Sequence, residues 1–225
     1  EIHERLVGSE MCIRDRTIDI GASSKAEAEK YVSPGDCAYF RSDYTELGNG
    51  YLREKALDDR IGCAIMVDIL NKNLPYDVTC VFTVQEEIGT RGAKVAAYTV
   101  KPDYAIVLET TTACDFSGND GEKRVCELGK GCVVSYMDRS TIYDRELYRL
   151  GFEKAKEINV PCQTKTLVAG GNDSGAIHSS VGGIRTVALS VPCRYLHSPS
   201  CMIKKSDVQS TAELAYAMYL ALAEK

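Results

Sequence analysis

From about residue 56 onward, the apolar positions alternate between a helical period and short continuous runs. The apolar residues of segment 61–69 recur at the helical period, and Asn71-Lys72-Asn73-Leu74-Pro75 predicts the stop of that helix. Residues 78–84 (VTCVFTV) are apolar and rich in β-branched side chains, which is typical of a buried strand. A short helix near 91–98 and a strand over 105–109 are expected next.

The same alternation continues to the C-terminus. The last helix is predicted to begin at Ser206, because Ser206-Asp207-Val208-Gln209 has the spacing of a capping box, in which serine and glutamine satisfy free backbone N–H groups. Before it we expect strands at 132–137, 164–168 and 185–190, with a helix at 144–157 between the first two of these strands. This order predicts an α/β fold with helices on both faces of one sheet.

Residues 1–48 have a different pattern, in which a short helix over 24–31 lies among extended runs and turn signals such as Gly48-Asn49-Gly50. They predict a piece of a β-rich module that is too small to close a core alone. The segment 7–16 fits neither period and resembles a translated sequencing-adapter remnant. We therefore expect residues 1–16 to be partly or wholly non-native, with an ordinary flexible terminus as the alternative.

Length, charge and cysteine spacing exclude several classes of protein. The 225 residues suffice for one substantial core, and a net charge of −5 without a basic stripe argues against a nucleic-acid partner. The apolar runs stop short of the roughly 18 residues that a membrane span needs. Ten scattered cysteines lack C-x-x-C spacing, which favours reduced thiols over a zinc ribbon. We expect a soluble cytoplasmic protein without a membrane partner.

Two adjacent carboxylates, Glu86 and Glu87, come directly after the apolar run 78–84 and before a glycine-containing turn. Ligands in open α/β sheets bind at the carboxyl ends of strands. Side chains alternate along a strand, so the two acids would have different surroundings. One could bind a metal, and the other could act on a substrate or water. A solvated acidic strand end is the alternative.

Three further residues occupy comparable positions. Asp58 precedes a helix, where it could also be an N-cap, and Glu109 ends a predicted strand, where it could simply be solvated. His197 is one of only three histidines and follows the strand 185–190, where a structural histidine is the alternative.

Five ordered segments contain these residues: ALDDRIGCA, VQEEIGTRGA, AIVLETT, GGNDSGAIHSS and PCRYLHSP. Together they resemble the signature blocks of the M42 family of metallo-aminopeptidases, over about residues 17–225. That family includes glutamyl aminopeptidases, tetrahedral (TET) aminopeptidases and members with an older endoglucanase label. The resemblance implies a three-layer zinc-peptidase-like catalytic domain over 49–225, with a central mixed sheet flanked by helices. It also implies that residues 1–48 are the remnant of a β-rich, PDZ-like dimerisation domain.

The resemblance also implies roles for the acidic residues. Asp58 would bridge two divalent ions, Glu87 and His197 would complete one metal site, and Glu109 would belong to the other. Glu86 would be the general base that takes a proton from the activated water. Asp59 and Arg60 would support these ligands from behind.

The glycine-rich segment 170–176 is expected to line the pocket, because glycine allows the backbone to approach a substrate closely. Gly171, Asp173 and His178 are the candidate substrate-binding residues, although a structural role is the more natural interpretation of His178. A phosphate cradle is disfavoured, because the segment lacks the lysine-serine ending of a P-loop.

By this resemblance, the protein removes N-terminal residues from short peptides. Carboxylate and imidazole ligands suit zinc or cobalt, with manganese as a third candidate. The full-length protein would form dimers that assemble into tetrahedral dodecamers. The alternatives are a related two-metal deacylase or carboxypeptidase, and an inactive fragment.

The family pattern includes an upstream histidine in an H-x-D motif, and this sequence contains no such motif. His3 is followed by Glu4 and Arg5 and is not a substitute. One metal site therefore keeps Asp58, Glu87 and His197, whereas the other keeps Asp58 and Glu109. We expect an N-terminally truncated chain with weakened metal binding and little activity.

Overall fold

The computed structural model describes residues 18–119 and 121–225, so the expectations for residues 1–16 lie outside the described chain. The chain divides into two compact units, Glu1–Tyr39 and Phe40–Lys225. In the first unit, the described residues form one short helix, α1 (Lys25–Ala28), whose N-cap Ser24 accepts a hydrogen bond from the N–H of Glu27. The boundary between these units falls after Tyr39. The division at residue 48 into a dimerisation remnant and a catalytic domain stays a prediction.

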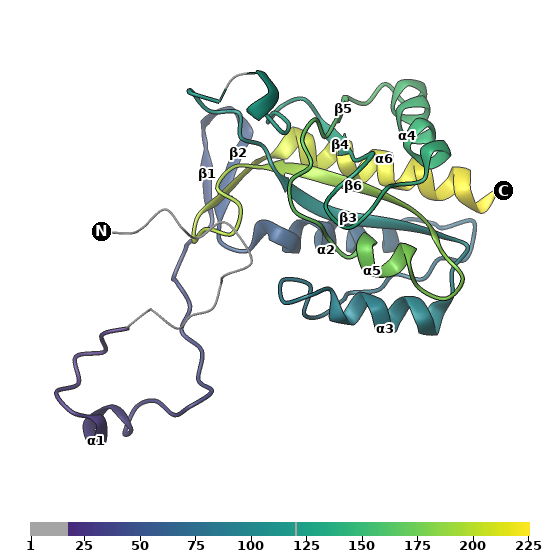
Figure 1. Ribbon diagram of the computed structural model, residues 1–225. Coiled ribbons are helices and arrows are strands. Elements are labelled where there is room, and N and C mark those ends of the chain that lie inside the picture. The colour runs from purple at the N-terminus through teal and green to yellow at the C-terminus, as the bar shows by residue number, and fades with distance from the viewer. Residues whose placement is uncertain (1–17, 120) are drawn as a thin grey trace. The chain divides into compact units, whose positions relative to one another are not determined.

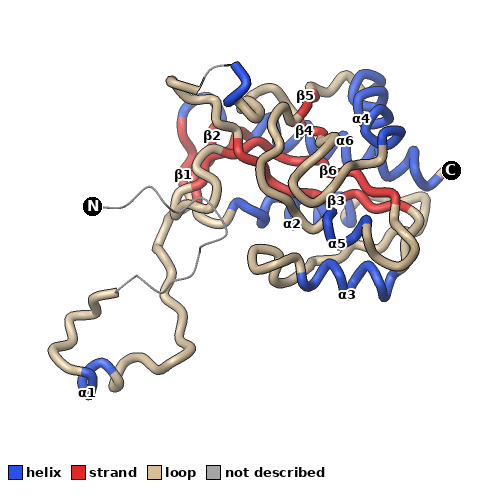
Figure 2. Tube along the Cα trace, in the orientation of Figure 1, coloured by secondary structure: helices blue, strands red, loops and turns tan. Residues whose placement is uncertain are grey.

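The second unit is built on a four-stranded mixed sheet (Figures 1 and 2). Its strand order is β3 (Tyr104–Thr112), β6 (Arg185–Cys193), β4 (Cys132–Val134) and β5 (Cys162–Thr164). β3 runs parallel to β6, β4 runs antiparallel to β6, and β5 runs parallel to β4. The predicted mixed sheet is therefore confirmed.

Helices cover both faces of this sheet. Alternate residues of β6, such as Val187 and Leu189, pack in the main core with α2 (Leu57–Leu70), α4 (Arg145–Glu157) and α6 (Lys205–Ala223). Ala188 points to the opposite face, because side chains alternate along a strand, and it packs there with Ile177 of α5 (Ser174–His178). α3 (Arg91–Val100) packs against α5 on that side (Figure 1). Among the described residues, no helix has the length and apolar character to cross a membrane.

A second, antiparallel sheet contains β1 (Thr45–Leu47), β2 (Tyr51–Glu54) and β7 (Cys201–Lys204), in that order. A turn at 48–50 joins the first two strands, and Asn49 adopts a left-handed conformation there with φ 62°. β7 follows β6 after a short loop, so this small sheet anchors the far end of that loop.

Most of the periodic segments have the predicted structure. The helices α2, α3 and α4 and the strands β3 and β6 are confirmed, although both strands are longer than expected. The strand predicted over 164–168 lies earlier, as β5, because the N–H of Lys165 still donates to Val134 of β4 but that of Thr166 donates to Val125. The strand predicted over 132–137 ends at Val134.

The buried strand predicted over 78–84 is wrong. This segment pairs with no strand of the described chain, and its apolar side chains are exposed, including Phe82 at 47% and Val84 at 66%. β-branched composition favours a strand only where a neighbour supplies the hydrogen bonds of a ladder and covers the side chains. No such neighbour lies among the described residues.

The capping box predicted at Ser206 is also wrong. α6 begins at Lys205, its N-cap Lys204 makes no side-chain capping bond, and Gln209 instead donates to Glu213. The buried carboxylate of Asp207 accepts hydrogen bonds from the N–H groups of Gly129 (2.7 Å) and Gly131 (2.9 Å). Asp207 therefore fastens α6 to the turn before β4.

Replacing Asp207 by alanine should lower the free energy of unfolding by about 2 to 3 kcal/mol, because two backbone N–H groups lose their acceptor. Urea denaturation measures this change. Glu213→Ala on the exposed side of the same helix is the matched control, with an expected loss below about 0.5 kcal/mol. Equal losses in the two variants would contradict the fastening role.

Candidate metal centre

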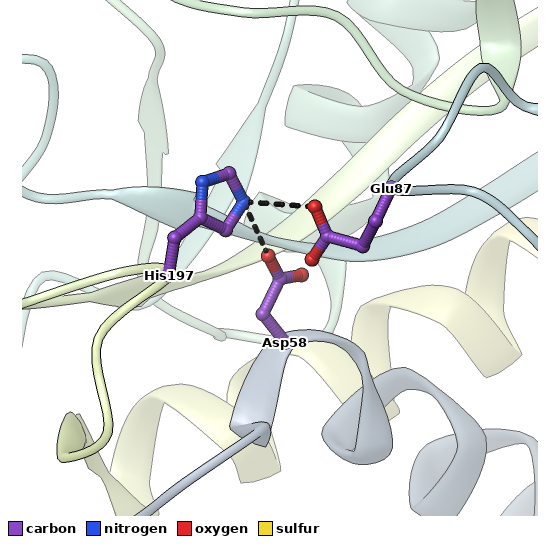
Figure 3. Close-up of side chains that lie close together, drawn as sticks. All are labelled: Asp58, Glu87 and His197. Carbon is purple, nitrogen blue, oxygen red and sulfur yellow. Dashed lines mark ion pairs between the residues drawn. The ribbon is translucent and has the colours of Figure 1, made fainter. Parts of the chain in front are cut away.

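Asp58, Glu87 and His197 converge on one point although they lie far apart in the sequence (Figure 3). Nε2 of His197 lies 3.2 Å from Oδ2 of Asp58 and 3.3 Å from Oε2 of Glu87. One ligand atom from each residue lies within 4.8 Å of the others, which is a spacing that one cation can bridge. The structure thus brings together three of the four predicted metal ligands.

Irregular backbone positions each of these three side chains. Asp58 lies in the first turn of α2 but has extended torsion angles (φ −86°, ψ 110°) and is joined to Asp59 by a cis peptide bond. The N-cap of this helix is Ala56, so the capping interpretation of Asp58 is wrong. His197 has a left-handed backbone (φ 59°) in the loop between β6 and β7.

Glu87 belongs to a tight turn that follows the extended segment 78–84. The N–H groups of Gly89 and Thr90 donate to the carbonyl of Glu86 (3.0 and 2.9 Å), and Gly92 donates to the carbonyl of Val84 (2.9 Å). A Cβ at Gly92 would lie 2.5 Å from that carbonyl oxygen, so only glycine allows the closure.

A second group of carboxylates shares Asp58 with the first. It contains Asp59 and the fourth predicted ligand, Glu109, which is 7% exposed near the end of β3. Asp59, expected only to support the ligands, offers a carboxylate oxygen within reach of the same cation. Arg60, expected to support the ligands, instead donates to Glu54 (3.0 Å).

Burial and mutual repulsion hold the protons on these acids. Burial raises the pKa of Asp59 to about 8 and that of Glu86 to about 7, and neighbouring carboxylates add to both shifts. Burial also raises the pKa of Glu109 well above its usual range. The hydrogen bond to Asp58 raises the pKa of His197 to about 9, so a protonated imidazole supplies positive charge to the cluster. A cation bound among these acids would favour their ionised forms.

Two more acids complete the centre. Glu86 is half-buried beside Glu87, and its pKa is raised in part by Asp173. Asp173 is buried, and its Oδ2 accepts a 2.6 Å hydrogen bond from Thr83, whereas its Oδ1 has no partner in the described chain. An unpartnered carboxylate oxygen of this kind suits a positively charged ligand.

The glycine-rich segment borders a cleft of about 930 Å³, whose lining includes none of the acids of the centre. Gly171 lines this cleft together with Gly89 and Thr90 of the turn that contains Glu87. A Cβ at position 171 would lie 2.5 Å from Oγ of Ser140, so a larger residue would require the serine hydroxyl or the loop to shift. His178 bonds the carbonyl of Ser174 (2.9 Å) within α5, in agreement with a structural role.

The donor set fits a divalent transition metal. Carboxylates and a single imidazole are ligands that zinc, cobalt and manganese accept. The two groups share Asp58, which suits two neighbouring ions bridged by one carboxylate.

Comparison with known proteins identifies the family. The sequence profile described as M42 glutamyl aminopeptidase matches residues 5–214. A protein from Acetivibrio thermocellus is 42% identical over 88% of this chain and 59% of its own length. The lysyl aminopeptidase of Pyrococcus furiosus is 34% identical over 89% of this chain and 58% of its own length.

Solved structures of aminopeptidases resemble this chain as well. An aminopeptidase from Desulfurococcus kamchatkensis superimposes with a TM-score of 0.85 at 33% identity, over 88% of this chain and 57% of that protein. The TET1 peptidase of Pyrococcus horikoshii, described as assembling into a tetrahedron or a large octahedral shell, gives 0.76 at 32% identity, over 96% and 65%.

The chain thus spans less than two thirds of the length of these relatives. The similarity to these relatives nevertheless extends over nearly all of this chain and includes every segment of the acidic centre. The chain belongs to the M42 glutamyl aminopeptidase family.

Proposed function

We propose that this protein is a metal-dependent aminopeptidase that removes N-terminal residues from short peptides with two divalent ions, zinc, cobalt or manganese. The observation that carries the proposal is the sharing of Asp58 by two groups of ligands. Family membership supports the same activity.

In this proposal Asp58 would be a ligand common to both ions, and Glu87 and His197 would complete one site. Glu109 belongs to the other site, and Asp59 stands beside it as an additional carboxylate. When bound, the ions supply Lewis-acid chemistry, which lowers the pKa of a water molecule and polarises the scissile carbonyl.

Glu86 is the proposed general base. It lies next to a proposed ligand, is half-buried and is not itself part of either ligand group. Its carboxylate would accept the proton of the attacking water and return it to the amine that leaves.

The charge of the centre favours a substrate with a free amine. The six carboxylates of Asp58, Asp59, Glu86, Glu87, Glu109 and Asp173 influence one another electrostatically. Once bound cations had ionised these acids, two divalent ions would neutralise four of the six negative charges, and the remainder would attract an N-terminal ammonium and repel a C-terminal carboxylate. This argument favours an aminopeptidase over a carboxypeptidase.

The activity test uses aminoacyl-p-nitroanilides. We expect release of p-nitroaniline that disappears with a chelator and returns with Zn²⁺ or Co²⁺. Activity only on substrates with blocked amines would instead indicate the related deacylase. Metal binding without turnover of either substrate would favour the inactive-fragment alternative.

Replacing Glu86 by glutamine should lower kcat by about 10² to 10⁴-fold, since the base is lost while the shape of the side chain is kept. Co²⁺ binding, followed by visible absorption, should be retained because Glu86 is not a proposed ligand. A parallel loss of Co²⁺ binding would show that Glu86 acts as a ligand instead.

Replacing His197 by alanine should weaken Co²⁺ binding by at least about tenfold, because the only proposed nitrogen ligand is removed. Equilibrium titration with Co²⁺ gives the affinity and does not require turnover. His178→Ala is the control, since its ring bonds a backbone carbonyl within α5. Equal effects of the two substitutions would contradict the assignment of His197.

We further propose that the full-length protein is a homo-oligomer, of dimers assembled into a tetrahedral dodecamer. The assembly described for the Pyrococcus horikoshii relative supports this proposal, as do exposed apolar side chains such as Phe82, Val95 and Tyr98. Light scattering coupled to size exclusion tests whether the present chain assembles, and a mass near 24.7 kDa would contradict assembly by this chain.

A further inference from the structure

Two buried cysteines delimit the loop that contains His197. Cys193 is the last residue of β6 and Cys201 is the first residue of β7, and they are 0% and 1% exposed. Both are free thiols. Each lies four residues from His197, one on either side.

Both thiols donate to the backbone of this loop. Sγ of Cys193 donates to the carbonyl of Arg194 at 3.3 Å. Sγ of Cys201 lies 3.6 Å from the carbonyl oxygens of Tyr195 and of Ser198, and so can donate to either. The two thiols also lie within hydrogen-bonding reach of each other.

The loop needs such support because its backbone is strained. Tyr195 and His197 both adopt left-handed conformations, with φ 58° and 59°, which residues with a Cβ rarely occupy. Strained backbone of this kind persists only where the surrounding structure holds it in place. The carbonyls that receive the thiol bonds belong to the residues around His197.

We propose that Cys193 and Cys201 are positioning residues that hold the His197 loop in the conformation that directs the imidazole toward Asp58 and Glu87. The consequence for metal binding rests on the proposed function. The effect on the loop itself does not.

An ion pair also supports the loop. Arg194 forms an ion pair with Asp115, whose two oxygens accept hydrogen bonds from Nε at 2.5 Å and from Nη2 at 3.0 Å. That pair fixes the start of the loop, where Cys193 also bonds the carbonyl of Arg194, whereas Cys201 can bond the carbonyls of Tyr195 and Ser198 further along it. Cys201 is therefore expected to affect His197 more than the end of β6.

Three variants separate positioning from packing. Cys193→Ala combined with Cys201→Ala removes both donors, and the corresponding double serine variant restores an O–H donor at each position. Cys132→Ala is the control, because Cys132 is 0% exposed in the same core but lies on β4. It removes a buried thiol without touching the loop.

Two measurements apply to all variants, namely titration with Co²⁺ followed by visible absorption and hydrogen exchange of the amides of residues 194–200. We expect the double alanine variant to bind Co²⁺ about tenfold more weakly, a typical result when groups behind a metal ligand are removed. Its loop amides should exchange faster. The double serine variant should recover most of the affinity, and Cys132→Ala should match the parent protein in both measurements.

Unchanged affinity and exchange in the double alanine variant would overturn the proposal, as would an equal loss in Cys132→Ala. If the parent protein binds no Co²⁺, the proposed function fails, and hydrogen exchange alone then decides whether the two cysteines position the loop. Faster exchange confined to the loop would then support the positioning role, and unchanged exchange would overturn it.

Discussion

The parallel pairing of β3 with β6 is the interaction on which the rest of the structure depends. Its register places Glu109 opposite Ser190, so both strands end at the same edge of the sheet. Beyond that edge, β6 continues into the loop that contains His197. α2 packs against β3 and brings Asp58 to the same place. One sheet edge thus collects side chains from segments that lie more than a hundred residues apart.

The centre is electrostatically unfavourable without a positive partner. Glu109 is nearly fully buried, Asp59 and Glu86 are half-buried, and burial together with mutual repulsion raises the pKa of all three. A fold gains nothing in stability from such an arrangement. Perturbed acids gathered at a strand end are instead typical of functional sites. The protonated imidazole of His197 partly offsets the negative charge, and its Nε2 would have to lose its proton before it could bind a metal ion.

Much of this could be predicted from the sequence, because some signals are local. The helical period of 61–69 predicts α2, and the ordered family blocks point to Asp58, Glu87, Glu109 and His197. Asp207 could not be predicted, since its partners Gly129 and Gly131 lie more than seventy residues away. The strand over 78–84 was mispredicted for the same reason, because composition does not reveal whether a neighbouring strand is present. The ligand position of Asp59 depends on the irregular first turn of α2, which no sequence period describes.

The unpaired segment 78–84 has a consequence for how the two halves of the centre respond to a ligand. Glu109 is part of a hydrogen-bonded ladder and is held whether or not a cation is present. Glu87 follows a segment outside any ladder of the described chain, and its turn is closed mainly by local bonds such as that from Gly92 to Val84. Ordering this turn would draw on the free energy of cation binding. The measured affinity would then report the stiffness of the turn as well as the quality of the ligands.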